Sequence, residues 1–158
     1  MKPRNNQRGV TLIEMIVVVI IIALVVSITT PSVAAGLDAI RLVTACSSVA
    51  SFVNAAATRA ERRQRPVELV VSAKENSLKS LSTDPGSARE LILPAGISVE
   101  AAVSLVGEDP ASAGRWLFMP GGTVPGIAIQ LANRHGGRRI VRLDPMTGFP
   151  RVERVEAK

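Results

Sequence analysis

The stretch "QRGVTLIEMIVVVIIIALVV", residues 7–26, decides how this chain is organised. From Val10 to Ile28 the only charged residue is Glu14, and fourteen of these 19 residues are Val, Ile or Leu. A helix of this length spans about 28 Å, close to the bilayer hydrocarbon thickness of about 30 Å. Insertion of the apolar side chains gains about 4–8 kcal/mol, and Glu14 offsets little of this because it lies near the start. We therefore expect a membrane-embedded helix in which Glu14 has a specific task.

The flanking charges predict the orientation of this helix. Lys2, Arg4 and Arg8 precede it, and the next positive charge is Arg41. Because positively charged flanks stay in the cytoplasm, we expect a cytoplasmic N-terminus and an exported remainder. The chain has a single cysteine, Cys46, so the exported part forms no internal disulfide and depends on packing.

Three kinds of N-terminal segment share this pattern. A secretory signal would be cut after the apolar run, where Ser32-Val33-Ala34 supplies small residues for a cleavage site. A plain membrane anchor would stay uncut. A leader cut before the apolar run accounts for Gly9 and Glu14 as well, and these two residues favour it.

The segment "RGVTLIEM", residues 8–15, resembles the processing site of type IV prepilins and type II secretion pseudopilins. The resemblance implies a leader from Met1 to Gly9, which a prepilin peptidase removes. The same enzyme then methylates the new N-terminus at Val10, where the family usually has Phe.

The resemblance also gives Glu14 its task, as the fifth residue of the mature chain. A carboxylate from one subunit can neutralise the ammonium at Val10 of its neighbour and set the register between subunits. At an effective dielectric of about 20 and a separation of about 4 Å, such a pair interacts by roughly 4 kcal/mol before desolvation. Pro31 lies where many pilins have a kink in the long helix.

Beyond Pro31 the pattern becomes amphipathic, and we expect the helix to run to about Arg63 and to end before Pro66. Asp38 and Arg41 are expected on its exposed, polar face, whereas Cys46 is expected as a buried side chain rather than a nucleophile. The residues predicted to face the core are Leu37, Ile40, Val43, Cys46, Val49 or Ala50, Val53, Ala56 or Ala57, and Ala60.

Short apolar runs alternate with turn residues in the rest of the chain, which is typical of antiparallel strands. The predicted strands lie within residues 67–73, 77–82, 90–94, 97–106, 115–119, 127–132, 138–144 and 149–155. The expected fold class is α+β, with a long N-terminal helix packed on an antiparallel sheet or small sandwich. The predicted segments are a leader (1–9), a transmembrane helix (10–30), an amphipathic continuation (31–65) and a β domain (66–158).

The segment from residue 118 to 152, "FMPGGTVPG…PMTGFPRV", looks like the last strands of the GspH/FimT pseudopilin family. The matching positions are Phe118, Pro120, Gly122, Thr147 and Gly148. The resemblance implies a pilin-like fold and a minor pseudopilin, at or near the tip of the periplasmic filament of a type II secretion system. It also implies anchoring in the bacterial inner membrane and no cofactor. The implied partners are the prepilin peptidase/methyltransferase, other pilin or pseudopilin subunits, and exported protein cargo.

A FimT-like minor pilin that binds DNA for uptake is the second expected function, because arginines are frequent in two parts of the chain. Neighbouring residues of a strand point to opposite faces, and no aromatic side chain is interleaved for base stacking, so secretion is favoured. A β domain secreted behind an ordinary signal is a third alternative. The candidate anion or DNA contacts are Arg59, Arg62, Arg63, Arg65, Arg134, Arg138, Arg139 and Arg142.

Catalytic and metal-binding patterns are not found in the sequence. One His and one Cys are too few for a metal cluster built from these residue types, and "GGTVPG" lacks the Lys-Ser/Thr of a phosphate loop. His135 lies in "NRHGG", a turn context that favours a solvated loop residue over a catalytic base. We therefore expect neither an enzyme nor a metal site.

Overall fold

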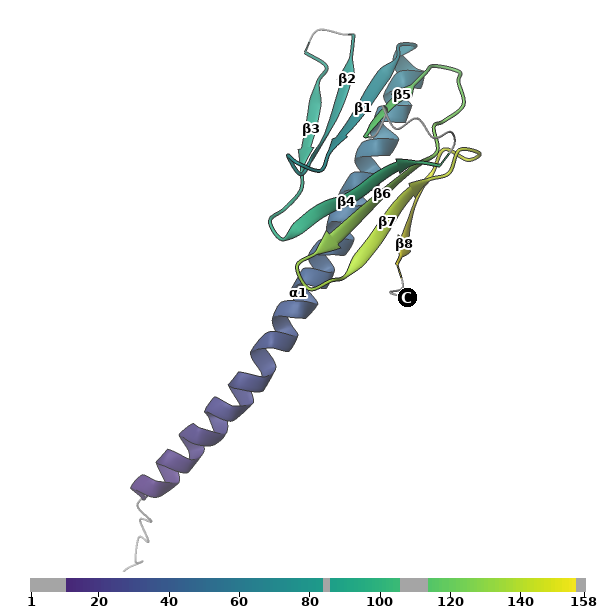
Figure 1. Ribbon diagram of the computed structural model, residues 1–158. Helices are drawn as coiled ribbons and strands as arrows, with labels where there is room; N and C mark the ends of the chain where they lie inside the picture. The colour runs from purple at the N-terminus through teal and green to yellow at the C-terminus, as the bar shows by residue number, and fades with distance from the viewer. Residues whose placement is uncertain (1–10, 84–85, 106–113, 156–158) are drawn as a thin grey trace, which may run out of the picture. The chain divides into compact units, whose positions relative to one another are not determined.

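The computed structural model describes residues 11–83, 86–105 and 114–155, without the side chains of residues 28–35. The chain divides into two compact units, Met1–Gly36 and Leu37–Lys158. Helix α1, Leu12–Arg63, begins in the first unit and ends in the second (Figure 1). Pro31 lies within α1, but its side chain is among those that are not described, so the kink there stays a prediction.

The end of α1 has a specific hydrogen-bonded cap. Gln64 adopts a φ of 51°, and its N–H donates to the Glu61 carbonyl at 3.4 Å. The N–H of Arg65 donates to the Ala60 carbonyl at 3.3 Å, which completes a Schellman motif, and Pro66 follows. The prediction that the helix runs to about Arg63 is confirmed.

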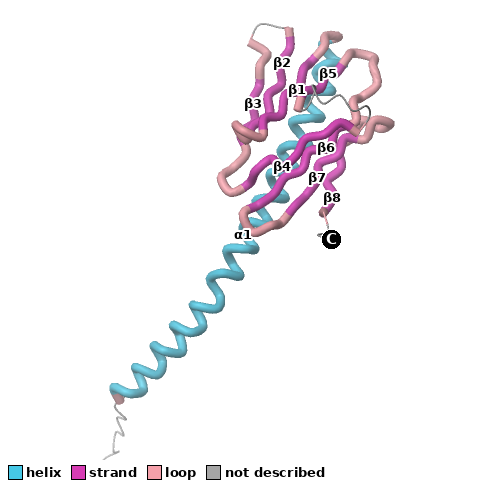
Figure 2. The backbone as a smooth tube through the Cα atoms, viewed as in Figure 1, coloured by secondary structure: helices cyan, strands magenta, loops and turns pink. Residues whose placement is uncertain are grey.

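Two four-stranded antiparallel sheets make up the rest of the second unit (Figure 2). The first has the order β3-β2-β1-β5 and the second the order β4-β6-β7-β8. Each strand overlaps a segment where the sequence predicts one, so the predicted α+β fold is confirmed. The strands are β1 Val67–Ser72, β2 Ser77–Ser82, β3 Arg89–Ile92, β4 Ile97–Ser104, β5 Arg115–Phe118, β6 Ile127–Asn133, β7 Arg138–Leu143 and β8 Pro150–Arg154.

Both sheets lie on the same side of the C-terminal half of α1 and share one core with it (Figure 1). The helix contributes a stripe of small and medium-sized side chains, because close approach of a sheet leaves little space beside the helix axis. Leu69 and Leu78 of the first sheet and Leu131 of the second are fully buried against this stripe. The buried helix residues are Leu42, Ala45, Cys46, Val49, Val53, Ala56 and Ala60.

The predicted core stripe is correct from Cys46 onward and wrong before it. Leu37, Ile40 and Val43 were expected in the core, but they are 51%, 64% and 43% exposed. Asp38 was expected on the exposed face, but it is only 6% exposed. Counting back from Val49 in steps of three and four leads to Cys46, Leu42 and Asp38, so one continuous helix face determines burial here rather than apolar character.

Asn76 connects the two sheets. It occupies the turn between β1 and β2 with a φ of 52°, a conformation that asparagine tolerates better than most residues. Its Nδ2 donates to the Ile97 carbonyl at 2.6 Å, and its Oδ1 accepts from the N–H of Val99 at 3.1 Å. The start of β4 is thereby fixed to the first sheet by a single side chain.

Candidate functional site

The apolar stretch at the start of α1 is fully solvent-accessible in the isolated chain. Every residue from 11 to 27 is exposed, and the large side chains include Leu12 at 78% and Leu24 at 61%. Exposed apolar surface on this scale marks contact with a membrane or with other protein chains. The first unit therefore needs lipid or neighbouring helices to cover it.

Glu14 lies in the first turn of α1, four residues after Val10. Its backbone N–H donates to the Thr11 carbonyl at 3.0 Å and approaches Thr11 Oγ1 at 3.4 Å, so Thr11 caps the helix. A carboxylate at this position also interacts favourably with the positive end of the helix dipole. The Glu14 side chain itself is exposed and available to a neighbouring chain. Gly9 and Val10, the predicted cleavage and methylation sites, lie outside the described residues.

Two stretches of α1 are candidates for a membrane span. Within the described residues, Gly36–Arg63 is long and apolar enough by length and composition, with a mean hydropathy of 1.3, whereas Leu12–Ser27 is a shorter apolar helix. However, Leu42, Cys46 and Val49 of the first stretch are buried in the core of the β unit. A stretch that already covers two sheets cannot also face lipid, so we assign membrane anchoring to the apolar helix that begins at Leu12.

Three of the predicted hairpin arginines are paired with carboxylates. Nε of Arg138 lies 2.9 Å from Oε2 of Glu100, which is placed at an irregularity in the pairing of β4 with β6. Arg142 lies 3.9 Å from Glu153, and Arg134 lies 3.6 Å from Asp38. These ion pairs lower the charge that the hairpins present to an anion.

The fourth hairpin arginine, Arg139, lies on the opposite face from Arg138, as strand alternation predicts. It lines a groove beside α1 together with Val43 of the helix and Phe149 and Val152 near β8. The predicted basic residues of the hairpins are therefore divided between two faces of the second sheet.

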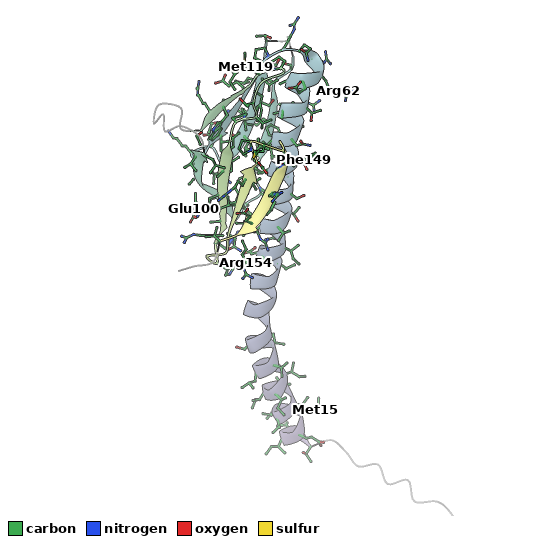
Figure 3. All side chains as sticks on the ribbon, turned by 90° about the vertical axis from the view of Figure 1, so that its right-hand side faces the viewer. Met15, Arg62, Glu100, Met119, Phe149 and Arg154 are labelled. Carbon is green, nitrogen blue, oxygen red and sulfur yellow. The ribbon has the colours of Figure 1, made fainter. Side chains whose placement is uncertain are left out.

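The arginines at the end of α1 form a separate group. Nη1 of Arg59 donates to the Ser87 carbonyl at 2.6 Å, whereas Arg62 and Arg63 are exposed. Arg62 is near one end of the β unit and Arg154 near the other (Figure 3). The two predicted basic segments thus do not make one continuous patch, and Arg65 lies just beyond the helix end.

Asp38 is the centre of a charged cluster that the sequence did not reveal. Its side chain is 9% exposed, and its oxygens lie 3.1 Å from Nη1 of Arg41 and 2.9 Å from Nδ1 of His135. Together with the contact to Arg134, this places three nitrogen-bearing side chains around one carboxylate. The signal available in the sequence was positional, because Asp38 falls on the same helix face as Leu42 and Cys46.

The two turns that carry the resemblance to the last pseudopilin strands meet in space. Phe118 at the end of β5 and Gly122 in the following loop line one groove of about 290 Å³ beside α1, together with Thr147 and Gly148 from the turn before β8. A Cβ added at Gly148, which has a φ of 70°, would lie 3.4 Å from Val124 Cγ2. The N–H of Gly121 donates to Oε1 of Glu61 at 2.9 Å and attaches the first turn to the helix.

Cys46 is fully buried, and burial raises the pKa of its thiol to about 11, partly offset by the positive charge of Arg139. A protonated thiol without solvent access is inert, so Cys46 acts as a core side chain. No group of three or more His, Cys, Asp or Glu side chains in the described parts of the chain is arranged to hold a metal ion.

Comparison with known proteins identifies one segment. Residues 4–30 match the family described as the prokaryotic N-terminal methylation motif. No curated protein and no solved structure was found to match the chain. The matched segment contains Gly9, Val10 and Glu14 together with the exposed apolar start of α1. The chain therefore carries a type IV pilin-like prepilin signal, which supports a pilin or pseudopilin class.

Proposed function

We propose that this chain is a minor pseudopilin of a type II secretion system, a structural subunit at or near the tip of a periplasmic filament that drives protein export. The observation that carries the proposal is the combination of the methylation motif with a helix start whose residues 11–27 are all exposed. The β unit from Leu37 onward is compact and has its own core. It therefore suits the folded periplasmic domain of a subunit that the apolar helix anchors.

Assembly, rather than catalysis, is the proposed mechanism. Removal of the leader leaves an ammonium at Val10, and the exposed carboxylate of Glu14 on a neighbouring subunit neutralises it as the subunit leaves the bilayer. Before assembly the apolar helix anchors the chain in the inner membrane, with the N-terminus in the cytoplasm and the β unit in the periplasm. The β unit then contacts other subunits or exported cargo.

DNA uptake is the weaker alternative for this fold. Sequence-independent DNA binding needs several unpaired cations along one surface, since each neutralised phosphate adds to affinity. Arg134, Arg138 and Arg142 are already paired with carboxylates, and Arg139 lies on the other face of β7. These contacts favour a structural role for the hairpins.

The role of Glu14 is tested with two variants. Glu14→Leu removes both the negative charge and the polar character of the side chain. Glu14→Gln removes the negative charge alone and keeps a polar side chain of the same size. We expect both variants to be processed, with loss of Met1–Gly9 and gain of one methyl group by intact mass, yet to be missing from filaments isolated from the periplasm. Glu75→Gln, which changes an exposed glutamate of the β unit, serves as the matched control and should assemble.

Two results would contradict the proposal. Normal incorporation of Glu14→Gln would show that the charge at this position does not control assembly. A mature protein that begins beyond Pro31 would show that the apolar helix is lost on export. Without this helix the chain could not assemble into the proposed filament.

A further inference from the structure

A groove of about 710 Å³ lies between the C-terminal half of α1 and the inner face of the first sheet. β3 is an edge strand of that sheet, on the side away from α1 (Figure 1). Arg59, Arg62 and Arg63 line it from the helix, and Arg89 lines it from β3. None of the described residues that line the groove is acidic.

The helix dipole does not explain this convergence of arginines. Cations in the last helical turn complement the negative end of the dipole, and this accounts for Arg62 and Arg63. Arg89 belongs to a different element, and its pairing with Ser80 of β2 turns it toward the buried face of the sheet. Like charges from two elements that meet in one groove repel each other unless an anion joins them.

The arginines of the groove differ from those of the hairpins in their partners. Arg59 is held by the Ser87 carbonyl and is only half exposed. Within residues 11–83, 86–105 and 114–155, Arg62, Arg63 and Arg89 form no ion pair. Three exposed guanidinium groups are therefore available to carboxylate or phosphate oxygens, which they bind through paired N–H donors.

The floor of the groove distinguishes between these two anions. Phe52 and Ala55 line the groove with apolar side chains, in the helical turns before Arg59. A nucleic acid strand gains affinity from bases stacked on exposed aromatic side chains, whereas this floor offers one half-buried phenylalanine and the exposed methyl group of Ala55. A peptide with carboxylates on one side and small apolar side chains on the other matches both the rim and the floor.

We propose that this groove, defined by Arg59, Arg62, Arg63, Arg89, Phe52 and Ala55, binds an acidic segment of a partner protein in extended form. From residue 51 to residue 63 the helix rises about 18 Å, which about six extended residues span. Alternating acidic and small apolar residues would place carboxylates beside Arg62 and Arg89 and a methyl group on Phe52. This inference goes beyond the filament role and does not depend on it, because the groove lies wholly within the β unit.

Peptide binding by the full chain, kept in micelles of an uncharged detergent, tests the proposal. The probe is a fluorescent peptide of alternating glutamate and alanine, compared with its glutamine–alanine analogue and with an oligothymidylate of equal charge. We expect the glutamate peptide to bind and the glutamine peptide not to bind. Arg62→Glu and Arg89→Glu should each weaken binding by about tenfold or more, as for central arginines of an interface.

Two further variants make the test independent of folding defects and of net charge. Arg151→Glu carries the same charge change on β8, outside the groove, and should alter binding by less than about twofold. Ala55→Trp places a large side chain on the floor at an exposed helix position, keeps every arginine and should also abolish binding. Circular dichroism of each variant verifies that the fold is kept.

Three outcomes would overturn the proposal. Equal binding of the glutamate and glutamine peptides, or no binding of either, would exclude recognition of carboxylates. Tighter binding of the oligothymidylate through Arg62 and Arg89 would assign the groove to nucleic acid. Unchanged peptide binding in Ala55→Trp would place the peptide elsewhere on the surface.

Discussion

The Nδ1 atom of His135 lies 2.9 Å from Oδ2 of Asp38, so the turn between β6 and β7 is held against helix α1 by a side-chain contact. The same carboxylate accepts a hydrogen bond from Arg41 at 3.1 Å. Asp38 is the first buried residue of the β unit, two residues after the boundary at Gly36. The cluster therefore fixes the second sheet to the helix near the point where the compact β unit begins.

Replacement of Asp38 tests the strength of this attachment. Asp38→Ala leaves Arg41, Arg134 and His135 without their shared acceptor, and hydrogen bonds to charged groups contribute about 1.5–3 kcal/mol each when buried. Because the partner side chains are 45–59% exposed, we expect a total loss nearer 1–3 kcal/mol of unfolding free energy. Urea unfolding can be followed through the fluorescence of Trp116, the single tryptophan.

Glu75→Ala is the matched control for Asp38→Ala, since it breaks an ion pair with Lys79 in which both side chains are well exposed. It should change stability by less than about 0.5 kcal/mol. Equal losses in the two variants would mean that burial of Asp38 adds nothing to its contacts.

Sequence patterns predicted the elements of this fold well because each element has a local cause. Pro66 and the turn residues bound the helix and the strands, and alternation within β1 and β5 identifies their buried faces. The error at Leu37, Ile40 and Val43 has a different origin. Apolar side chains there suggested the core, but which helix face is covered depends on where the sheets lie, and that is a tertiary property.

The candidate sites likewise include some that the sequence reveals and some that depend on the tertiary structure. Glu14 could be found because its charge conflicts with an apolar segment, which is visible in the sequence alone. The convergence of Arg89 with Arg62 and Arg63 could not be found, since Arg63 and Arg89 are 26 positions apart and their meeting depends on the pairing of β3 with β2. The same holds for the pairing of Asp38 with His135.

Asn76 provides a test of the link between the two sheets. Asn76→Gly removes both hydrogen bonds to β4 but accommodates the φ of 52°, and it should cost about 1–3 kcal/mol. Asn76→Ala removes the same bonds and also strains the backbone, which should add roughly 1 kcal/mol. Urea unfolding of both variants measures the two contributions separately, and an alanine variant as stable as the glycine variant would contradict the backbone part.

Burial of the Cys46 thiol should make the unfolding free energy depend on pH. Its pKa is raised by burial from 9.0 to about 11 in the folded chain, so the native state keeps a proton that the unfolded state releases. Below about pH 9 the thiol is protonated in both states and does not change the unfolding free energy with pH. The unfolding free energy should fall as the pH rises from about 9 to about 11. The Cys46→Ala variant should lack this component, which is measured as the difference between the two stability profiles.

Alkylation provides a second readout for the same residue. At pH 8 iodoacetamide should modify Cys46 only after unfolding in urea, because the folded thiol is both protonated and 0% exposed. Rapid modification of the folded chain would contradict the core assignment.

The choice of membrane segment within α1 can be tested by placing one charge in each stretch. Ile20→Arg puts a guanidinium near the middle of the apolar helix that begins at Leu12, where insertion should cost about 2.5–3.5 kcal/mol. Ile40→Arg makes the same change at a position that is 64% exposed on the β unit, where no lipid is expected. We predict that Ile20→Arg lowers the fraction of the chain that stays in the membrane pellet after carbonate extraction, while Ile40→Arg leaves that fraction unchanged. The opposite result would assign the span to Gly36–Arg63, and the β unit could then not keep Leu42, Cys46 and Val49 in its core.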